Sequence, residues 1–521
     1  MNTVKLSLST TAIVSLAISS AAAQEAGISP KLNFVFIMTD QQRASLCARE
    51  GYPLDVTPFV DKMADQGIWF DRAFTATPAS GPARVAMLTG RFPKATRVNS
   101  NHNIEDAVYE DHLFALAHRN GYRTALVGKN HSFLKPKDAD YWSPYEHFAQ
   151  PDAKDEETKA FNKYLGTTDM YADYNPAPFG AEMQHPYRMV DDALQWIKTD
   201  DNKPFMMWLS FPEPHNPYQV SEPYYSMFPP EKLPPLLTGL TDLATKGEKY
   251  ETLHEMQSLG HKGYYENIGR LRSNYLGMIR LIDDQIARFV EQLRENGMYE
   301  NTVFVIMSDH GDFAGEYGLM KKGVGLSDAI ARVPFVWFGG GIPAKGISHA
   351  HVSLVDLFPT FCEMIGQEIP KGVQGRSLID IINGRQFPEN EFRSIMIENG
   401  YGGQYYTKED GTDYIKEGAM RQKPGFFDEL NTWSQSGSTR ALRMGDWKLE
   451  FDMLGNGLMY NVKNDPSEIK NLYNDEKYIK IQLELVSELL KWDIATEDPL
   501  PLPRLRYRFK RNLHNYLFYT K

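Results

Sequence analysis

Short runs of almost uninterrupted apolar residues alternate along the chain with longer segments that have helical spacing. The runs are NFVFIMTD at 33–40, YRTALVGK at 122–129, PFMMWLSF at 204–211, NTVFVIMSD at 301–309 and VPFVWFGG at 333–340. A strand that is apolar on both faces has to be covered on both faces, as strands of parallel sheets are. The alternation therefore predicts an α/β sandwich with a large, mostly parallel central sheet flanked by helices.

The segments between these runs carry apolar residues at the spacing of a helix. Several of them end in Gly or Asn-Gly, which commonly terminate helices. We expect helices within 57–67, 112–121, 188–199 and 270–297.

The chain changes character from about Gly384. The sequence RALRMGDWKLEFD, followed by Gly-rich turn residues and GLMYNVKNDPSE, predicts an antiparallel hairpin over 440–468. A helix is expected over about 476–494. The sequence thus predicts a larger N-terminal domain at 24–384 and a smaller C-terminal α+β subdomain with an antiparallel sheet at 385–521.

Residues 1–23 have the pattern of a cleaved secretory signal. A single Lys5 precedes a mostly apolar run, and Ala21-x-Ala23 ends it as the expected processing site. A short anchor helix is the alternative, but the run is brief for a membrane span and is interrupted by Ser and Thr. No other stretch approaches a spanning length. We therefore expect a periplasmic or secreted protein that does not span the membrane.

Charge and cysteine content argue against two further classes of protein, those that bind nucleic acid and those built on disulfides. The formal net charge is −11 and the chain has no arginine-rich run, which argues against a nucleic-acid partner. Cys47 and Cys362 lie far apart in the sequence, which argues against a disulfide framework. A single bridge between them stays open, although burial as small apolar residues is the favoured interpretation.

Polar side chains appear where the apolar runs end. Asp40 and Gln41 follow the first run, and Asp309 and His310 follow the fourth. Ligands of open α/β sheets gather at the carboxyl ends of strands. Two carboxylates, an amide oxygen and an imidazole would suit a divalent cation such as calcium or magnesium. The alternative is that each Asp only caps a turn, as single Asp residues after strands usually do.

Cationic and proton-transferring side chains follow other runs in the same way. Lys129 and His131 come after the second run, His215 after the third, and Lys322 after the Asp309 segment. Each one alone is better explained as a surface Lys or a satisfied loop His. As a set beside two carboxylates, they favour the binding of an oxyanion ester, with cations for its oxygens and His for proton transfer.

The stretch PASGPARVAMLTGR at 78–91 places a Ser at the start of a predicted helix. The free N–H groups of that helix would point at whatever Ser80 attacks, and Arg84, one turn later, would reach the same place. Interpreting Ser80 as a simple N-cap accounts for the Ser and for Pro82, but not for Arg84.

The pattern Ser80-x-Pro82-x-Arg84, followed by Leu88-Thr89-Gly90-Arg91, resembles the signature of the formylglycine-dependent type I sulfatases of the alkaline phosphatase superfamily, in its Ser form. The resemblance extends over most of the mature chain and follows the family's order. Its motifs are MTDQ at 38–41, the signature itself, GKNH at 128–131, PEPHNPY at 212–218, SDHGDFAGEYGLMKKG at 308–323 and the region from GDWKL to DPSE.

The resemblance implies an alkaline-phosphatase-like fold and a modified nucleophile. Ser80 would be oxidised after translation to Cα-formylglycine by a formylglycine-generating maturation enzyme, and the hydrate of this residue would attack sulfur. A geminal diol expels sulfate by regenerating its aldehyde, so no second substitution is needed. By similarity, calcium would be held by Asp40, Gln41, Ser80, Asp309 and His310.

The resemblance also implies roles for the remaining polar residues. Arg84 and Lys129 would stabilise the hydrate, and His131 would be the base that later expels sulfate. His215 and Lys322 would bind the sulfate group and assist the leaving oxygen.

Some positions depart from the commonest family pattern. Gln41 replaces a frequent second Asp, and His310 stands where Asn is also found. These neutral ligands lower the ligand charge and weaken the expected calcium affinity. Ala83 replaces a common Ser, and Asn130 and Ser132 replace the usual aromatic and Leu, which would alter substrate fit.

Export and the long connections at 132–187, 220–265 and 400–436 favour a sulfated carbohydrate substrate. These connections are polar, aromatic and rich in Pro or Gly, and loops of this length are often functional. The predicted sugar contacts are Arg97, His102, Tyr405, Tyr406 and Trp433. The alternative is that these side chains only pack the loops against the main domain.

Two other functions stay open from the sequence. One is hydrolysis of phosphate or phosphonate esters, which other members of the superfamily catalyse at a similar metal-centred site. The other is a carbohydrate-binding protein without turnover, against which the complete set of expected catalytic residues argues.

Overall fold

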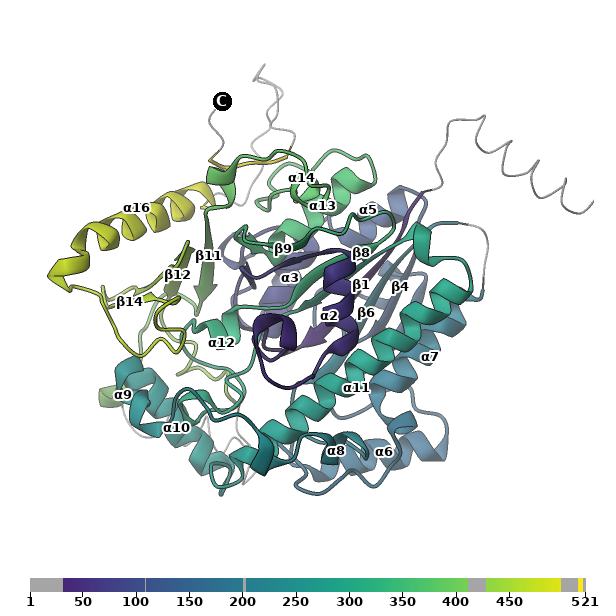
Figure 1. The fold of residues 1–521 in the computed structure, drawn as a ribbon, viewed down its shortest axis with the longest axis horizontal. Coiled ribbons are helices and arrows are strands. Elements are labelled where there is room, and N and C mark those ends of the chain that lie inside the picture. Colours follow the sequence, from purple (N-terminus) through teal and green to yellow (C-terminus); the bar gives the residue numbers. More distant parts are fainter. Residues whose placement is uncertain (1–30, 108, 200–202, 411–427, 498–513, 519–521) are drawn as a thin grey trace, which may run out of the picture.

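The centre of the computed structural model is an eight-stranded sheet (Figure 1). The structure describes residues 31–107, 109–199, 203–410, 428–497 and 514–518. Strand β8 is antiparallel to its neighbours β7 and β2, and the other pairs are parallel, which confirms the predicted mostly parallel sheet. In spatial order the strands are β5 (Tyr141–Pro144), β4 (Arg123–Gly128), β6 (Phe205–Pro214), β1 (Asn33–Asp40), β7 (Thr302–Ser308), β8 (Phe335–Gly339), β2 (Ile68–Phe70) and β9 (Gly346–Ser348).

Helices cover both faces of this sheet, as the uninterrupted apolar runs predict. In β1, Phe34 and Phe36 enter the hydrophobic cluster on one face, and Val35 and Ile37 enter the cluster on the other. The first face packs against α3 (Ser80–Thr89), α5 (Leu113–Arg119) and α13 (Leu357–Met364). The second packs against α2 (Pro58–Gln66), α7 (His185–Ile197) and α11 (Ile268–Glu295).

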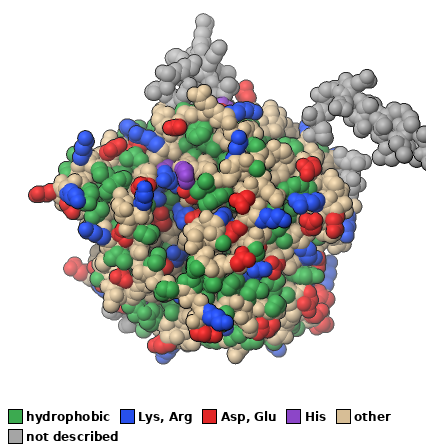
Figure 2. Space-filling model, viewed as in Figure 1, with side chains coloured by type: hydrophobic (Ala, Val, Ile, Leu, Met, Phe, Trp, Pro, Cys, Tyr) green, Lys and Arg blue, Asp and Glu red, His purple; other side chains and the backbone are tan. Residues whose placement is uncertain are grey.

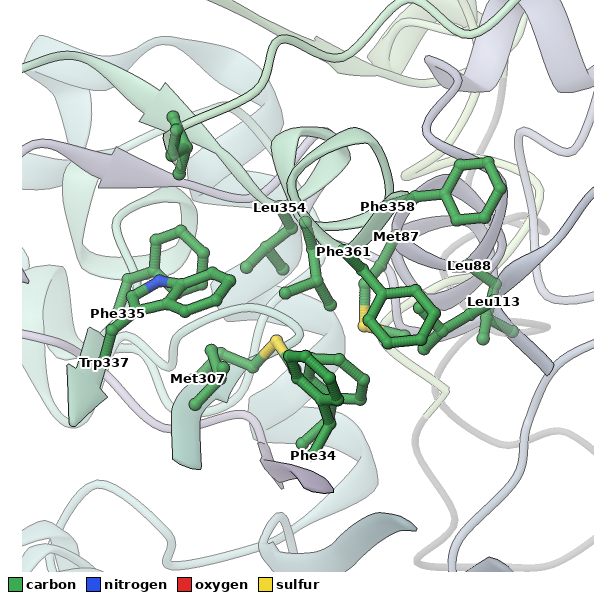
Figure 3. Packing of buried hydrophobic residues seen from close by; sticks show 14 of the residues in the cluster. Phe34, Met87, Leu88, Leu113, Met307, Phe335, Trp337, Leu354, Phe358 and Phe361 are labelled. Atoms are coloured by element: carbon green, nitrogen blue, oxygen red, sulfur yellow. The ribbon is translucent and has the colours of Figure 1, made fainter. Parts of the chain in front are cut away.

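The core on the first face is closely packed around aromatic rings (Figure 3). Phe361 of α13 meets the ring of Phe34 edge-on, with ring centroids 5.0 Å apart. Met87 and Leu88 pack in the same cluster. They belong to helix α3, whose first residue is Ser80. Burial of this apolar face therefore fixes where the helix presents its first turn.

The remaining elements of the main unit are short or lie in the long connections. They are β3 (Ala73–Phe74), α4 (Pro93–Thr96), α6 (Glu156–Thr167), α8 (Tyr224–Met227), α9 (Leu243–Lys246), α10 (Glu248–Gly260), α12 (Asp328–Ala331), β10 (Val352–Ser353) and α14 (Ile379–Ile382).

A second, antiparallel sheet follows in the C-terminal part, as predicted. Its four strands are in sequence order: β11 (Ser394–Asn399), β12 (Thr439–Met444), β13 (Trp447–Asp452) and β14 (Gly457–Asn461). Helix α16 (Ile479–Ala495) packs on this sheet through Leu485, Leu489 and Trp492. The same cluster includes Phe74 and Phe92 of the main unit. The predicted domain boundary at 384 stays a prediction. Apolar contacts join the two parts of the chain across it.

Both cysteines are buried and neither forms a disulfide among the described residues, which agrees with their interpretation as small apolar residues. Within the described residues, no helix is long and apolar enough to cross a membrane. The predicted signal at 1–23 lies outside the described residues. On the face shown in Figure 2, acidic and basic side chains are interspersed, without a large patch of one sign.

A buried ion cluster joins the C-terminal sheet to the main unit. Glu468, which is almost fully buried, accepts hydrogen bonds from Lys246 Nζ at 3.0 Å and from Lys448 Nζ at 2.9 Å. Oε1, the oxygen that accepts from Lys448, also accepts from the backbone N–H of Asp328, at 2.7 Å. Burial alone would raise the pKa of Glu468, but the two lysines lower this pKa to about 2. The carboxylate therefore stays ionised and holds α9, α12 and β13 together.

We predict that Glu468→Gln lowers the free energy of unfolding by about 3 kcal/mol at neutral pH, because the buried ammonium group of Lys246 loses its ion-pair partner and that of Lys448 keeps only Glu450 and Asp328 among the described residues. The pKa of Glu468 is about 2 in the folded state, below the ordinary value of 4.5. Its stabilisation is therefore complete above pH 4.5 and is lost as the pH falls toward 2. Thermal unfolding across this range should show a shallower decline for the variant than for the wild type.

The control is Glu105→Gln, in which an exposed carboxylate loses an ion pair with Lys135 at 3.0 Å. This variant should unfold like the wild type at every pH, since exposed pairs contribute about 0–1 kcal/mol. Equal unfolding temperatures for the two variants at neutral pH would contradict the role of Glu468.

Candidate active site

Two buried carboxylates lie side by side at the carboxyl ends of the central strands β1 and β7. The strands pair in register, with Thr39 opposite Ser308. Asp40 is the last residue of β1, and Asp309 directly follows β7, where its N–H donates to the carbonyl of Thr39 at 3.2 Å. Both side chains are completely buried. Two like charges this close require buried positive charge nearby.

Arg84 supplies that charge from the second turn of α3. Its Nη2 donates to Asp40 Oδ2 at 3.0 Å and its Nε to Asp309 Oδ2 at 2.9 Å. Its Nη1 donates to Ser210 Oγ of β6 at 2.7 Å and to the carbonyl of Lys129, just after β4, at 3.0 Å. One guanidinium thus connects the ends of β1, β4, β6 and β7.

Ser80 is the first residue of α3 and lies in the same buried cluster. The Nδ1–H of His310 donates to the carbonyl of Gly311 at 2.9 Å, so Nε2 is left as an acceptor. The hydroxyl of Ser80 donates to this Nε2 at 2.9 Å. Burial lowers the pKa of His310, which keeps the ring neutral and able to accept.

The atoms around Ser80 fit a cation. Ligand atoms of Asp40, Asp309 and His310 lie within 4.8 Å of one another. Oδ1 of Asp40 is buried and has no hydrogen-bond partner among the described residues, so a carboxylate oxygen is left to coordinate an ion. Oxygen ligands and one neutral imidazole suit a hard divalent ion.

The predicted ligand Gln41 makes other contacts in this structure. Its amide Nε2 donates to Asp312 Oδ2 at 2.7 Å, and its Oε1 accepts from Lys322 Nζ at 2.8 Å. Its backbone N–H donates to Asp309 Oδ1 at 3.0 Å, with Gln41 at a φ of 71°. Gln41 is therefore next to the other proposed ligands, and its role as a metal ligand stays a prediction.

Two buried lysines, Lys129 and Lys322, border the cluster. Lys129 donates to Asp40 Oδ2 and, at 2.6 Å, to Nε2 of His147. Lys322 donates to Gln41 Oε1 and lies 3.3 Å from Nε2 of His215. Burial is the main cause that lowers the pKa of Lys129. Together with Arg84, these residues make the pocket suitable for an anion.

Three histidines stand at the partly exposed entrance to the cluster. The rings of His147 and His215 are stacked, with centroids 3.8 Å apart. His215 Nδ1–H donates to the carbonyl of Asn216 at 2.7 Å, which leaves Nε2 as an acceptor. His131 has a φ of 41°, and its buried Nδ1 has no hydrogen-bond partner among the described residues. Burial and the nearby lysines lower the pKa of each ring well below its usual value, so all three are neutral.

His147 and Glu429 were not among the residues predicted from the sequence. His147 sits in a tight turn in which Glu146 and Ala149 form a β-bridge. Glu429 lies 3.1 Å from Lys322 and 3.4 Å from Lys321. Burial would raise the pKa of Glu429, but these lysines lower this pKa to about 2. No motif marks either residue, since both lie in long connections.

The predicted sugar contacts lie in two separate segments of the chain. Arg97 and His102 are exposed in the segment that follows α4. The ring of Tyr405 lies under Lys249 Nζ at 4.1 Å, and its hydroxyl donates to Asp452 at 3.3 Å. Tyr406 is partly buried, and Trp433 is 1% exposed, both in one cluster with α10. Their contact with a substrate stays a prediction.

The comparisons with known proteins agree with this geometry. The sulfatase family profile matches residues 32–367, which is more than half of the chain. The chain belongs to the sulfatase family. It is 28% identical to an arylsulfatase of Clostridium perfringens over 88% of this chain and 94% of the relative. It is 23% identical to an N-acetylglucosamine-6-O-sulfatase of Bacteroides thetaiotaomicron, over 92% and 89%.

A solved structure shares the fold of this sulfatase. The phosphonate monoester hydrolase of Agrobacterium radiobacter superimposes with a TM-score of 0.72 and 21% identity, over 89% of this chain and 96% of that one. The family match and the sulfatase relatives confirm the predicted recognition, and the enzyme is a sulfuric ester hydrolase. The individual site residues stay predictions that the geometry brings together.

We predict that Arg84→Met destabilises the metal-free enzyme by about 3–5 kcal/mol, because Asp40 and Asp309 would be buried without their shared cation. The stability of Arg84→Lys should lie between those of Arg84→Met and the wild type, since one ammonium group cannot reach all four acceptors. Thermal unfolding in the presence of a chelator measures the difference. The surface variant Arg119→Met, which loses an exposed pair with Asp111 and an exposed hydrogen bond to the carbonyl of Glu110, should unfold like the wild type. A wild-type unfolding temperature for Arg84→Met would contradict the central role of the guanidinium.

Proposed function

We propose that this sulfatase is exported and hydrolyses sulfate esters of a polysaccharide or oligosaccharide. Its nucleophile would be a Cα-formylglycine made from Ser80, and its metal ion calcium. The main support is the position of Ser80, whose hydroxyl lies 2.9 Å from His310 beside two buried carboxylates. Around it stand Arg84, Lys129 and Lys322, the cations that a sulfate ester requires.

The pocket would use two kinds of positive charge, a metal ion and basic side chains. Asp40, Asp309 and His310 would hold calcium at the Ser80 side, where the ion would supply positive charge for the attacking oxygen. Arg84 and Lys129, which both donate to Asp40, would orient the hydrated formyl group. Because Arg84 is fixed by four acceptors, this orientation costs no rearrangement during the reaction.

The proton chemistry of the pocket would use the neutral histidines. His131 offers a buried ring nitrogen without a hydrogen-bond partner among the described residues, which suits the base that takes the remaining hydroxyl proton of the sulfated hydrate as sulfate leaves. Lys322 and His215 lie 3.3 Å apart and would hold the sulfate group. Lys322 could then donate a proton toward the leaving oxygen, with Glu429 and Gln41 fixing its ammonium group.

Conversion of Ser80 requires a maturation enzyme that reaches the chain early. Ser80 is 1% exposed, and every residue of α3 is buried. An enzyme that oxidises this side chain must therefore act before the domain closes around the helix. The proposed export through residues 1–23 is compatible with this order, because a chain that crosses the membrane unfolded exposes residue 80 before it folds.

A carbohydrate substrate is supported by the relatives and by the loops. One relative is named for the 6-O-sulfate of N-acetylglucosamine, and another is an ulvan-active sulfatase of Formosa agariphila. The exposed Arg97 and His102 and the half-buried Tyr405 and Tyr406 could contact a sugar. Trp433 would do so only if the surrounding loop moved, because its ring is enclosed.

We predict that residue 80 in enzyme purified from its native host lacks two hydrogen atoms relative to Ser in peptide mass spectrometry. The same enzyme should release free sulfate from one member of a panel of sulfated oligosaccharides, and Ser80→Ala should abolish release without lowering the unfolding temperature. A phosphonate monoester serves as the competing substrate. Unmodified Ser80 in active enzyme, or faster turnover of the phosphonate, would reject the proposal in favour of phosphoryl transfer.

We also predict that calcium raises the unfolding temperature of the metal-free enzyme. A ligand at one hundred times its dissociation constant adds about 2.7 kcal/mol to the stability of the folded state. Asp309→Asn should remove most of this shift, because it loses a charged ligand while keeping the side-chain shape. Asp111→Asn, an exposed acid on the surface, should keep the full shift. A shift that survives in Asp309→Asn would place the ion elsewhere.

A further inference from the structure

The outer face of α16 carries a stripe of exposed large apolar side chains. Ile479 is 37% exposed, Leu483 64%, Leu490 57% and Ile494 63%. These positions fall on one side of the helix, opposite the residues Leu485, Leu489 and Trp492 that pack on the C-terminal sheet. Figure 1 shows α16 as the outermost helix at one edge of the molecule. An exposed stripe of this kind marks an interaction surface.

The stripe reads the same in both directions along the helix. From Ile479 the apolar residues follow at intervals of four, seven and four residues, in the order Ile, Leu, Leu, Ile. Its midpoint falls between Val486 and Ser487. A helix with such a pattern matches an antiparallel copy of itself, since a two-fold axis through the midpoint brings Leu483 onto Leu490 and Ile479 onto Ile494.

Two opposite charges on one flank of the stripe follow nearly the same symmetry, with their midpoint one residue beyond that of the stripe. Glu484 and Lys491 directly follow Leu483 and Leu490, and both are exposed. They lie one heptad apart on the same flank. The two-fold axis therefore places Glu484 of one chain near Lys491 of the other, twice in the interface. The small side chain of Ser487, exposed at the midpoint, lets the two helices approach.

We propose that two copies of this chain associate through antiparallel packing of their α16 helices. The interface is isologous, with the four apolar residues of each helix at its centre and the Glu484–Lys491 pairs at its rim. Each α16 has 17 residues and is therefore about 25 Å long. A contact of this size is at the small end of specific interfaces, so the dimer forms reversibly with concentration. The proposal does not depend on the substrate.

Sedimentation equilibrium of the full chain over a wide range of concentrations tests the association. We expect a reversible monomer–dimer equilibrium, and Leu483→Glu or Leu490→Glu should leave only monomer. Leu454→Glu is the matched control, because Leu454 is also 57% exposed but lies between β13 and β14. A wild-type chain that stays monomeric, or a dimer that Leu483→Glu leaves intact, would overturn the proposal.

Charge exchange and cross-linking test the antiparallel arrangement itself. Glu484→Lys places like charges opposite each other twice and should weaken the dimer about tenfold. The double variant Glu484→Lys/Lys491→Glu should restore it. In oxidising buffer, Ser487→Cys should form a disulfide between copies, whereas Lys480→Cys, two turns away, should not. Cys47 and Cys362 are buried and do not interfere. No restoration and no cross-link at 487 would overturn the antiparallel arrangement.

Discussion

The buried guanidinium of Arg84 is the contact on which the catalytic centre depends. It bridges Asp40 and Asp309 and also reaches Ser210 and the carbonyl of Lys129. Without it, two carboxylates would be buried at adjacent strand ends with only Lys129 as counter-charge. Because Arg84 lies four residues after Ser80 on a completely buried helix, the same contact fixes the position of Ser80 relative to Asp40 and Asp309, the proposed metal ligands.

The strands, and the grouping of polar residues at their ends, could be predicted from the sequence because they depend on short-range patterns. Apolar runs such as 33–40 are long enough to require cover on both faces, and the structure places β1 at those residues. The polar residues after β1 and β7 meet because parallel strands end at the same edge. The position of Ser80 followed from the helix that it begins.

The entrance of the pocket could not be predicted in the same way. His147 is held by a tight turn and by stacking on His215, and neither contact leaves a pattern in the sequence. Glu429 reaches Lys322 from a region more than one hundred residues later in the chain. Gln41 could be predicted as part of the site, but not its contacts with Asp312 and Lys322, which depend on the fold of the loop after β7.

The pocket is built from both parts of the chain, because Glu429 of the C-terminal part contacts Lys321 and Lys322 of the main unit. The segment that the family profile matches ends at residue 367, so it includes Lys321 and Lys322 but not the carboxylate that neutralises them. The C-terminal region is therefore not a removable module. A chain in which this region was remodelled would carry a different net charge beside Lys322 even if every motif residue stayed the same. Substrate preference in such a lineage can evolve without any change in the signature sequence.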